Sequence, residues 1–308
     1  MYGRKRFGFI FVVVLVVICV AVVAVFRIAS NRLDSAVTIE TAKSGLLRFG
    51  VEQALGVTAE DIVPVFSRYY SDASIELETG FFPDLFNRFL QEEIEAMLWR
   101  GKPGKYDVSL LEREKMNYRL EPVARSAIVC IVNQANPVPF LCVEDLAKIY
   151  TARKISWDNG NDIEVYLNGK DLRLQEQFLA LAVPGDNRLT AWHAGSDEDV
   201  MRIVAENTRA IGILPFSRLG ELKSAERSSS TFRVVPLCQK KGGAPVMPSQ
   251  NTIYQEKYPL GYIVYYMYRK EKALAAGFGA WLAKEGQKGF VRSSLVPYRN
   301  PTYLIQLQ

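Results

Sequence analysis

An uninterrupted apolar run near the N-terminus places the strongest constraint on what this chain can form. Residues 7–26 read FGFIFVVVLVVICVAVVAVF, twenty residues without a charge. A helix rises about 1.5 Å per residue, so this run would be about 30 Å long, the thickness of a bilayer's hydrocarbon core. Residues 1–32 are therefore expected to form a cytoplasmic N-terminus and one transmembrane anchor, with the rest of the chain folding separately.

The charges around the run set its orientation. Arg4, Lys5 and Arg6 precede it, and the positive-inside rule then places everything after residue 32 on the periplasmic or extracellular side. A cleaved signal peptide is the alternative, but the run is long for a signal core and no clear cleavage site follows it. Lipoprotein processing at Cys19 is excluded because Ile18 precedes it and apolar sequence continues beyond. We expect a single-pass protein of the cytoplasmic membrane.

The charge balance argues against nucleic-acid binding. The formal net charge is +5, but five of the 38 lysines and arginines lie in residues 1–32, which contain no acid. The remaining 33 basic residues match the 33 acidic residues of the chain. A nucleic-acid-binding domain needs a basic footprint, so no nucleic-acid partner is expected.

Cysteine and histidine usage bounds the chemistry. Cys19 lies in the apolar run, which leaves Cys130, Cys142 and Cys238, an odd number that cannot pair completely. Buried free thiols are the first interpretation, and a Cys130–Cys142 bridge is the alternative. His193 is the only histidine and no CxxC motif occurs, so the residue types for a zinc site or a histidine-activated nucleophile are missing. We expect no metal, no cofactor and no enzymatic activity.

The rest of the chain contains two regions with different sequence patterns. Residues 33–61 resemble a juxtamembrane stalk with a modest helical pattern. Beyond them, strand-like and helical patterns follow one another along the chain. This alternation predicts an α/β fold with mainly parallel sheets. Strands are expected at 62–66, 73–77, 106–111, 127–132, 178–183, 210–214 and 262–268, and helices at 83–98, 143–150, 196–207 and 272–285.

Six segments in this order resemble the phosphate-binding proteins of ABC importers. They lie at 120–138, 143–157, 210–213, 243–245, 258–260 and 285–297.

The resemblance covers roughly residues 62–297. It implies a two-lobed type II periplasmic binding protein fold over 62–308, with the ligand in the cleft between the lobes. Lobe 1 would comprise about 62–130 and 259–308, and lobe 2 about 131–258. The implied partners are phosphate or another small anion and the permease of an ABC importer.

The resemblance also implies three ligand-binding loops. In this family a phosphate dianion is held by backbone N–H groups, hydroxyls and an arginine fork. The matching positions are Thr79 and Gly80 in the first loop, Arg113 in the second, and Asp186, Asn187, Arg188 and Thr190 in the third.

All three loops depart from the family's pattern. Phe81 and Phe82 stand where hydroxyls are expected, Glu112 stands in a serine position, and Asp186 adds a second acid. Phosphate binding is therefore expected to be weak or absent. Two functions stay open: a membrane-anchored solute-binding protein that presents an anion or small polar ligand to an ABC importer, or a non-transport sensor or assembly protein that contacts another envelope protein and has a decayed pocket.

Overall fold

The computed structural model describes residues 40–183, 185, 188–221 and 231–300. The described residues from Glu40 onward belong to one compact unit. The expected anchor at 7–26 and two expected ligand residues, Asp186 and Asn187, lie outside the described residues. Within these residues no helix is both long enough and apolar enough to cross a membrane.

A ten-stranded sheet runs through the described part of the chain in the order β2-β1-β3-β11-β4-β8-β6-β7, with β9 and β12 also paired to β4. Its strands are β1 (Gly45–Glu52), β2 (Ala73–Gly80), β3 (Ala96–Arg100), β4 (Tyr118–Asn133), β6 (Glu164–Asn168), β7 (Trp192–Ala194), β8 (Ala210–Pro215), β9 (Phe232–Val234), β11 (Gly261–Arg269) and β12 (Val296–Pro297). A separate parallel pair joins β5 (Leu141–Cys142) to β10 (Leu237–Cys238).

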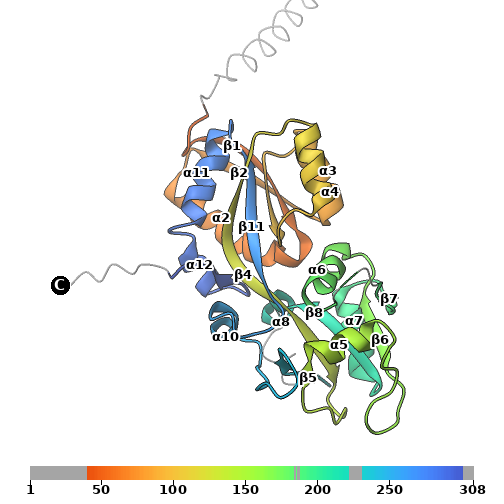
Figure 1. Ribbon diagram of the computed structural model, residues 1–308. Coiled ribbons are helices and arrows are strands. Elements are labelled where there is room, and N and C mark those ends of the chain that lie inside the picture. The colour runs from red at the N-terminus through yellow and green to blue at the C-terminus, as the bar shows by residue number, and fades with distance from the viewer. Residues whose placement is uncertain (1–39, 184, 186–187, 222–230, 301–308) are drawn as a thin grey trace, which may run out of the picture. The chain divides into compact units, whose positions relative to one another are not determined.

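Helices connect and cover these strands (Figure 1). They are the short 3-10 helix η1 (Gln53–Leu55), α2 (Gly56–Tyr69), α3 (Phe82–Leu90), α4 (Lys105–Arg113), α5 (Val143–Tyr150), α6 (Leu172–Ala182), α7 (Asp197–Glu206), α8 (Phe216–Glu221), α10 (Gln250–Tyr254), α11 (Ala273–Leu282) and α12 (Gln287–Val291).

The long strand β4 divides the sheet into two lobes (Figure 1). Its first part, through Ala127, pairs antiparallel with β11, and its second part, from Ile128, pairs antiparallel with β8. We call the half with β1, β2, β3 and β11 lobe 1, and the half with β6, β7 and β8 lobe 2. The chain passes back from lobe 2 to lobe 1 beside β4, just before β11. There the Ile128 N–H donates to the Leu260 carbonyl at 2.9 Å. β4 reads as a continuous apolar run because both of its faces are covered there.

Aromatic packing fills the core of lobe 1. The Phe278 ring of α11 meets Phe49 of β1 at 5.4 Å and Phe66 of α2 at 4.9 Å between centroids, both edge to face. On the other face of the sheet, Phe82 and Phe86 of α3 pack on Trp99 of β3. Each lobe-1 face is therefore sealed by a helix layer that holds the strand ends in place.

Residues 45–61, expected in a stalk, instead form β1, η1 and the start of α2. Leu47, Phe49 and Val51 are fully buried and alternate along β1, which pairs in parallel with both β2 and β3. In the sequence this period of two resembles a weak helical pattern, because neighbouring Leu46 is also apolar although it is exposed.

Several other elements differ in type from expectation. The runs 62–66, 106–111 and 178–183, expected as strands, lie in α2, α4 and at the end of α6. The helix expected over 83–98 ends at Leu90, and Leu98 belongs to β3. Short apolar runs of buried helices and buried strands look alike in sequence. The remaining expected helices and strands are confirmed in type, including α7, whose Ser196 hydroxyl accepts from the Asp199 N–H at 3.1 Å.

The cysteines pair in a way that the sequence did not indicate. Cys142 and Cys238 lie opposite each other on β5 and β10 and form a disulfide. Cys130 is a buried free thiol in β4, and burial raises its pKa far above the ordinary value. The alternative bridge Cys130–Cys142 is thus wrong, and the expectation of free thiols holds only for Cys130 among these three. The partners are 96 residues apart, so only the fold brings them together.

Candidate functional site

The described members of the expected ligand set do not gather in one place. Thr79 and Gly80 end the edge strand β2, whereas Arg113 ends α4 with 70% of its side chain exposed and pairs with Glu114 at 3.0 Å. Arg188 and Thr190 are exposed, and Thr190 lines a groove beside α5. None of these five lines the cavity between the lobes. Convergence of the expected set on that cavity is therefore not found for its described members.

A cavity of about 210 Å³ lies between the lobes instead. Lobe 1 contributes the ends of β1 and β3, and lobe 2 contributes the end of β6 and the starts of α6 and α7. Ligand sites of open α/β sheets form outside the carboxyl ends of parallel strands, which is where this cavity lies. Its lining residues are Glu52, Gln53, Ala54, Phe81, Arg100, Asn168, Lys170, Asp171, Gly195, Ser196, Asp197, Glu198 and Arg218.

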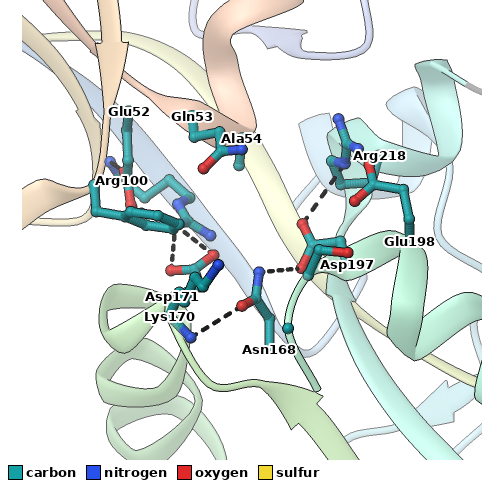
Figure 2. Close-up of a pocket in the computed structure, with 13 residues that line it drawn as sticks. Glu52, Gln53, Ala54, Arg100, Asn168, Lys170, Asp171, Asp197, Glu198 and Arg218 are labelled. Atoms are coloured by element: carbon teal, nitrogen blue, oxygen red, sulfur yellow. Dashed lines mark hydrogen bonds and ion pairs between the residues drawn. The ribbon is translucent and has the colours of Figure 1, made fainter. Parts of the chain in front are cut away.

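Arg100, the last residue of β3, lines this cavity from lobe 1 and is 1% exposed (Figure 2). Its guanidinium donates to Glu52 of the same lobe and, at 2.7 and 2.8 Å, to both carboxylate oxygens of Asp171 in lobe 2. Its backbone N–H also donates to Glu52, at 2.9 Å. Asp171 is held in turn because it caps α6 by accepting from the Leu174 N–H at 2.9 Å. A buried ion pair thus joins the two lobes.

Two donors of Arg100 have no partner among the described residues. Its Nε and Nη1 atoms are enclosed, and no acceptor in the described part of the chain reaches either one. Burial alone would lower the Arg100 pKa, but Asp171 and Glu52 outweigh burial and hold the pKa well above its ordinary value. Buried polar groups without partners are rare and ask for an explanation. A ligand that offers an acceptor to Arg100 would supply one.

A second charged cluster forms the lobe-2 wall of the cavity (Figure 2). Asp197, the first residue of α7, accepts from the Asn168 amide at 3.0 Å and faces Arg218 at 3.6 Å. Arg218 also pairs with Glu198. Burial raises the pKa of Asp197, since the partial desolvation of its carboxylate outweighs these donors. The wall is therefore rich in acids that are already hydrogen-bonded.

The lobes also touch directly beside the cavity. Arg173 of α6 donates to the carbonyls of Arg100, at 3.1 Å, and Lys102, and its guanidinium covers the Phe82 ring at 4.5 Å. The Ser217 hydroxyl donates to the Ala54 carbonyl at 2.8 Å. This arrangement is a closed one in which protein groups bridge the cleft.

The charges in the cavity do not suit a dianion. Four acids line it and three basic side chains accompany them: Glu52, Asp171, Asp197 and Glu198, with Arg100, Lys170 and Arg218. A like-charge contact at about 4 Å costs roughly 4 kcal/mol at an effective dielectric of 20. The cavity is therefore suited to a small polar ligand with little net negative charge. No group of three or more metal-ligating side chains occurs in the part of the chain that the structure describes.

The sequence contains a signal for the charged residues of this cavity, because each lies at or just after the end of a strand. Glu52 ends the buried strand β1, Arg100 ends the buried strand β3, and Asp171 follows β6 closely. Charged residues directly after apolar strands meet at one edge of a parallel sheet. The local sequence pattern did not reveal this signal, because it predicted none of β1, β3 and β6 as a strand.

A two-lobed α/β fold with a polar cavity at the strand ends defines the class of periplasmic-type binding proteins. The family model described as a PBP superfamily domain matches residues 101–285, more than half of the chain. The chain therefore belongs to the PBP (periplasmic binding protein) superfamily. The sequence predicts no enzymatic activity, and membership of a superfamily of binding proteins agrees with that prediction.

Solved structures support the same fold. A protein from Clostridium perfringens assigned as a phosphate ABC transporter substrate-binding protein, with bound phosphate, matches with a TM-score of 0.67 and 16% identity over 83% of this chain and 100% of its own. An ABC-type phosphate transport receptor from Vibrio cholerae matches with a TM-score of 0.63 and 16% identity over 81% and 99%.

The fold is shared more widely than phosphate transport. The reduced OxyR regulatory domain from Pseudomonas aeruginosa matches with a TM-score of 0.51 and 16% identity over 78% of this chain and 100% of that domain. No curated protein sequence matches this chain. The similarity to the phosphate-binding family is confirmed in fold, and the ligand has to be argued from the cavity.

Proposed function

We propose that this chain is a membrane-anchored, extracytoplasmic solute-binding protein that holds a small polar ligand between its lobes and presents it to an ABC importer. The observation that supports this most directly is Arg100, whose two unpartnered donors are buried at a cavity where the lobes meet. The ligand would offer a neutral or weakly charged acceptor, because Glu52 and Asp171 already balance the guanidinium.

Location outside the cytoplasm has two supports. The apolar run at 7–26 follows Arg4, Lys5 and Arg6, which favours a single-pass anchor with the domain outside. The Cys142–Cys238 disulfide is the second support, because disulfides persist in oxidising compartments and are rare in the cytosol. A tethered binding protein would deliver its ligand to a neighbouring permease in the same membrane.

The second candidate function is a sensor or assembly protein that does not transport. The observation in its favour is that both carboxylate oxygens of Asp171 in lobe 2 accept hydrogen bonds from the Arg100 guanidinium in lobe 1. The chain's own carboxylate thus takes the place of an anionic ligand in closing the cleft. In that function the closed surface itself would contact another envelope protein.

Ligand retention separates the two functions. Full chain purified in mild detergent is incubated with an extract of bacterial small metabolites, washed, and analysed by mass spectrometry for released compounds. We expect one polar compound at about one per chain whose retention depends on the cavity around Arg100, since that cavity is small. Gln53→Trp, which fills the cavity from an exposed position on its lining, should abolish retention of that compound.

The matched control is Glu60→Trp, an exposed site on α2 outside the lining, which should retain the compound. If the wild-type chain retains nothing, or if Gln53→Trp retains as much as wild type, the solute-binding proposal is wrong.

A further inference from the structure

A second concave site lies between the lobes and shares no lining residue with the cavity around Arg100. It is a groove of about 670 Å³ bounded by the start of α4, one side of α6 and the start of β11. Its size falls within the range of about 300–1,000 Å³ that small-molecule sites occupy. The lining residues are Gly101, Lys102, Gly104, Lys105, Tyr106, Asp107, Arg173, Glu176, Gln177, Ala180, Leu181, Gly261, Tyr262, Ile263 and Tyr265.

Gln177 of α6 is the unexplained group in this groove. The residue is only 9% exposed, and neither Nε2 nor Oε1 of its amide has a hydrogen-bond partner among the described residues. The Nε2 atom lies against Gly101, where an added Cβ would come within 2.4 Å of it. A buried amide that makes no hydrogen bonds costs free energy. Turning this amide into the groove therefore sacrifices no bond and offers a donor and an acceptor side by side.

Aromatic rings line the same groove as Gln177. Tyr106 is 74% exposed although it is large and apolar in its body, whereas Tyr262 and Tyr265 are buried in the wall. A groove that contains both an exposed aromatic side chain and a buried amide is suited to a flat ring, which stacks on the tyrosine and pairs with the amide along its edge.

The start of α4 gives the groove an anion-binding end. Gly104 is the N-cap and carries no side chain to accept from the first-turn N–H groups, which favours an anion there. Exposed Lys102 and Lys105 line the same end. The nearby acids are already engaged, since Asp107 accepts from the Gly104 N–H at 2.7 Å and faces Arg173 at 3.5 Å. Glu176 likewise pairs with Arg173, at 3.0 Å.

We propose that this groove binds a nucleoside monophosphate. Gln177 pairs with the edge of the base, Tyr106 stacks on the base, and Lys102 and Lys105 hold the phosphate at the start of α4. Adenine fits best, because a glutamine amide pairs in bidentate fashion with the N6 donor and N7 acceptor of adenine. The groove contacts both lobes, so an occupant would report on or stabilise their closed arrangement. The proposal stands independently of the solute held at Arg100.

Adenosine monophosphate (AMP) is the probe that tests this assignment. Isothermal titration of full chain in detergent with AMP should give saturable binding at one per chain. Inosine monophosphate should bind about tenfold more weakly or worse, since its carbonyl replaces the N6 donor. Adenosine should also bind more weakly, because it lacks the phosphate, and inorganic phosphate should compete only at concentrations far above those of AMP.

The decisive variant is Gln177→Leu, which keeps the side chain's size and removes no existing hydrogen bond. It should retain the wild-type melting temperature, lose AMP affinity by about tenfold or more, and no longer distinguish AMP from inosine monophosphate. Lys170→Ala, at the cavity around Arg100, is the control that should leave AMP binding unchanged.

No saturable AMP binding at millimolar concentration, equal affinity in Gln177→Leu, or inorganic phosphate that binds as tightly as AMP would each overturn the proposal. These outcomes are separable from solute retention at the other cavity, which Gln53→Trp should abolish and Gln177→Leu should not affect.

Discussion

Replacing Arg100 with methionine should lower the free energy of unfolding by about 3–5 kcal/mol. The substitution keeps much of the side chain's volume but leaves Glu52 and Asp171 buried without the guanidinium that both contact. Removing one partner of a buried ionic cluster is costly because the remaining charges stay desolvated. The measurement is urea unfolding of the full chain in mild detergent, followed by far-UV circular dichroism.

Two comparisons make this result specific. Arg88→Met removes an arginine that pairs with Glu78 and Glu93 at a half-exposed position and should cost about 1 kcal/mol or less. Adding Glu52→Gln and Asp171→Asn to Arg100→Met removes both orphaned charges and should recover a large part of the loss. An Arg100→Met chain as stable as Arg88→Met would show that the cluster at the lobe junction is misplaced.

Removing the disulfide should lower the free energy of unfolding by about 2–5 kcal/mol. Cys142 and Cys238 are 96 residues apart, and closing a loop of about 100 residues restricts the unfolded chain by about 4.7 kcal/mol in the chain-entropy model. The change is the double substitution Cys142→Ala and Cys238→Ala, measured by the same unfolding experiment.

A reducing agent provides the internal check. It should destabilise the wild-type chain by a similar amount, leave the double variant unchanged, and also destabilise Cys130→Ala, in which the bridge is intact. A wild-type chain whose unfolding is insensitive to reductant would contradict the pairing of β5 with β10.

The parts of the fold that sequence predicted well have unambiguous local patterns. Helix α7 has a Ser196 cap followed by three acids, and β11 is a long run of β-branched and aromatic residues. The crossing strand β4 was recognised from its apolar run and its resemblance to the phosphate-binding family. In each case propensity, periodicity and chain order agree.

The candidate site was harder to predict because its residues follow β1, β3 and β6, and the local sequence pattern predicted none of the three as a strand. Taking 45–52 as a stalk moved the first ligand loop from the end of β1 to the end of β2, an edge strand. Arg100 and Asp171 then appeared unrelated, since they lie 71 residues apart and belong to different lobes. Local pattern shows that a charged residue follows a strand, but only the sheet order shows which strand ends meet.

The cavity around Arg100 is most directly tested by phosphate itself. Labelled phosphate is titrated into the wild-type full chain and into Asp171→Asn, with circular dichroism to verify that both are folded. Because Glu52, Asp171, Asp197 and Glu198 line the cavity, the wild-type chain should bind phosphate more weakly than micromolar. Asp171→Asn removes one charge at Arg100 and should bind at least about tenfold more tightly, at about 1.4 kcal/mol for each factor of ten. Submicromolar binding by the wild-type chain, unchanged in Asp171→Asn, would contradict the assignment of this cavity.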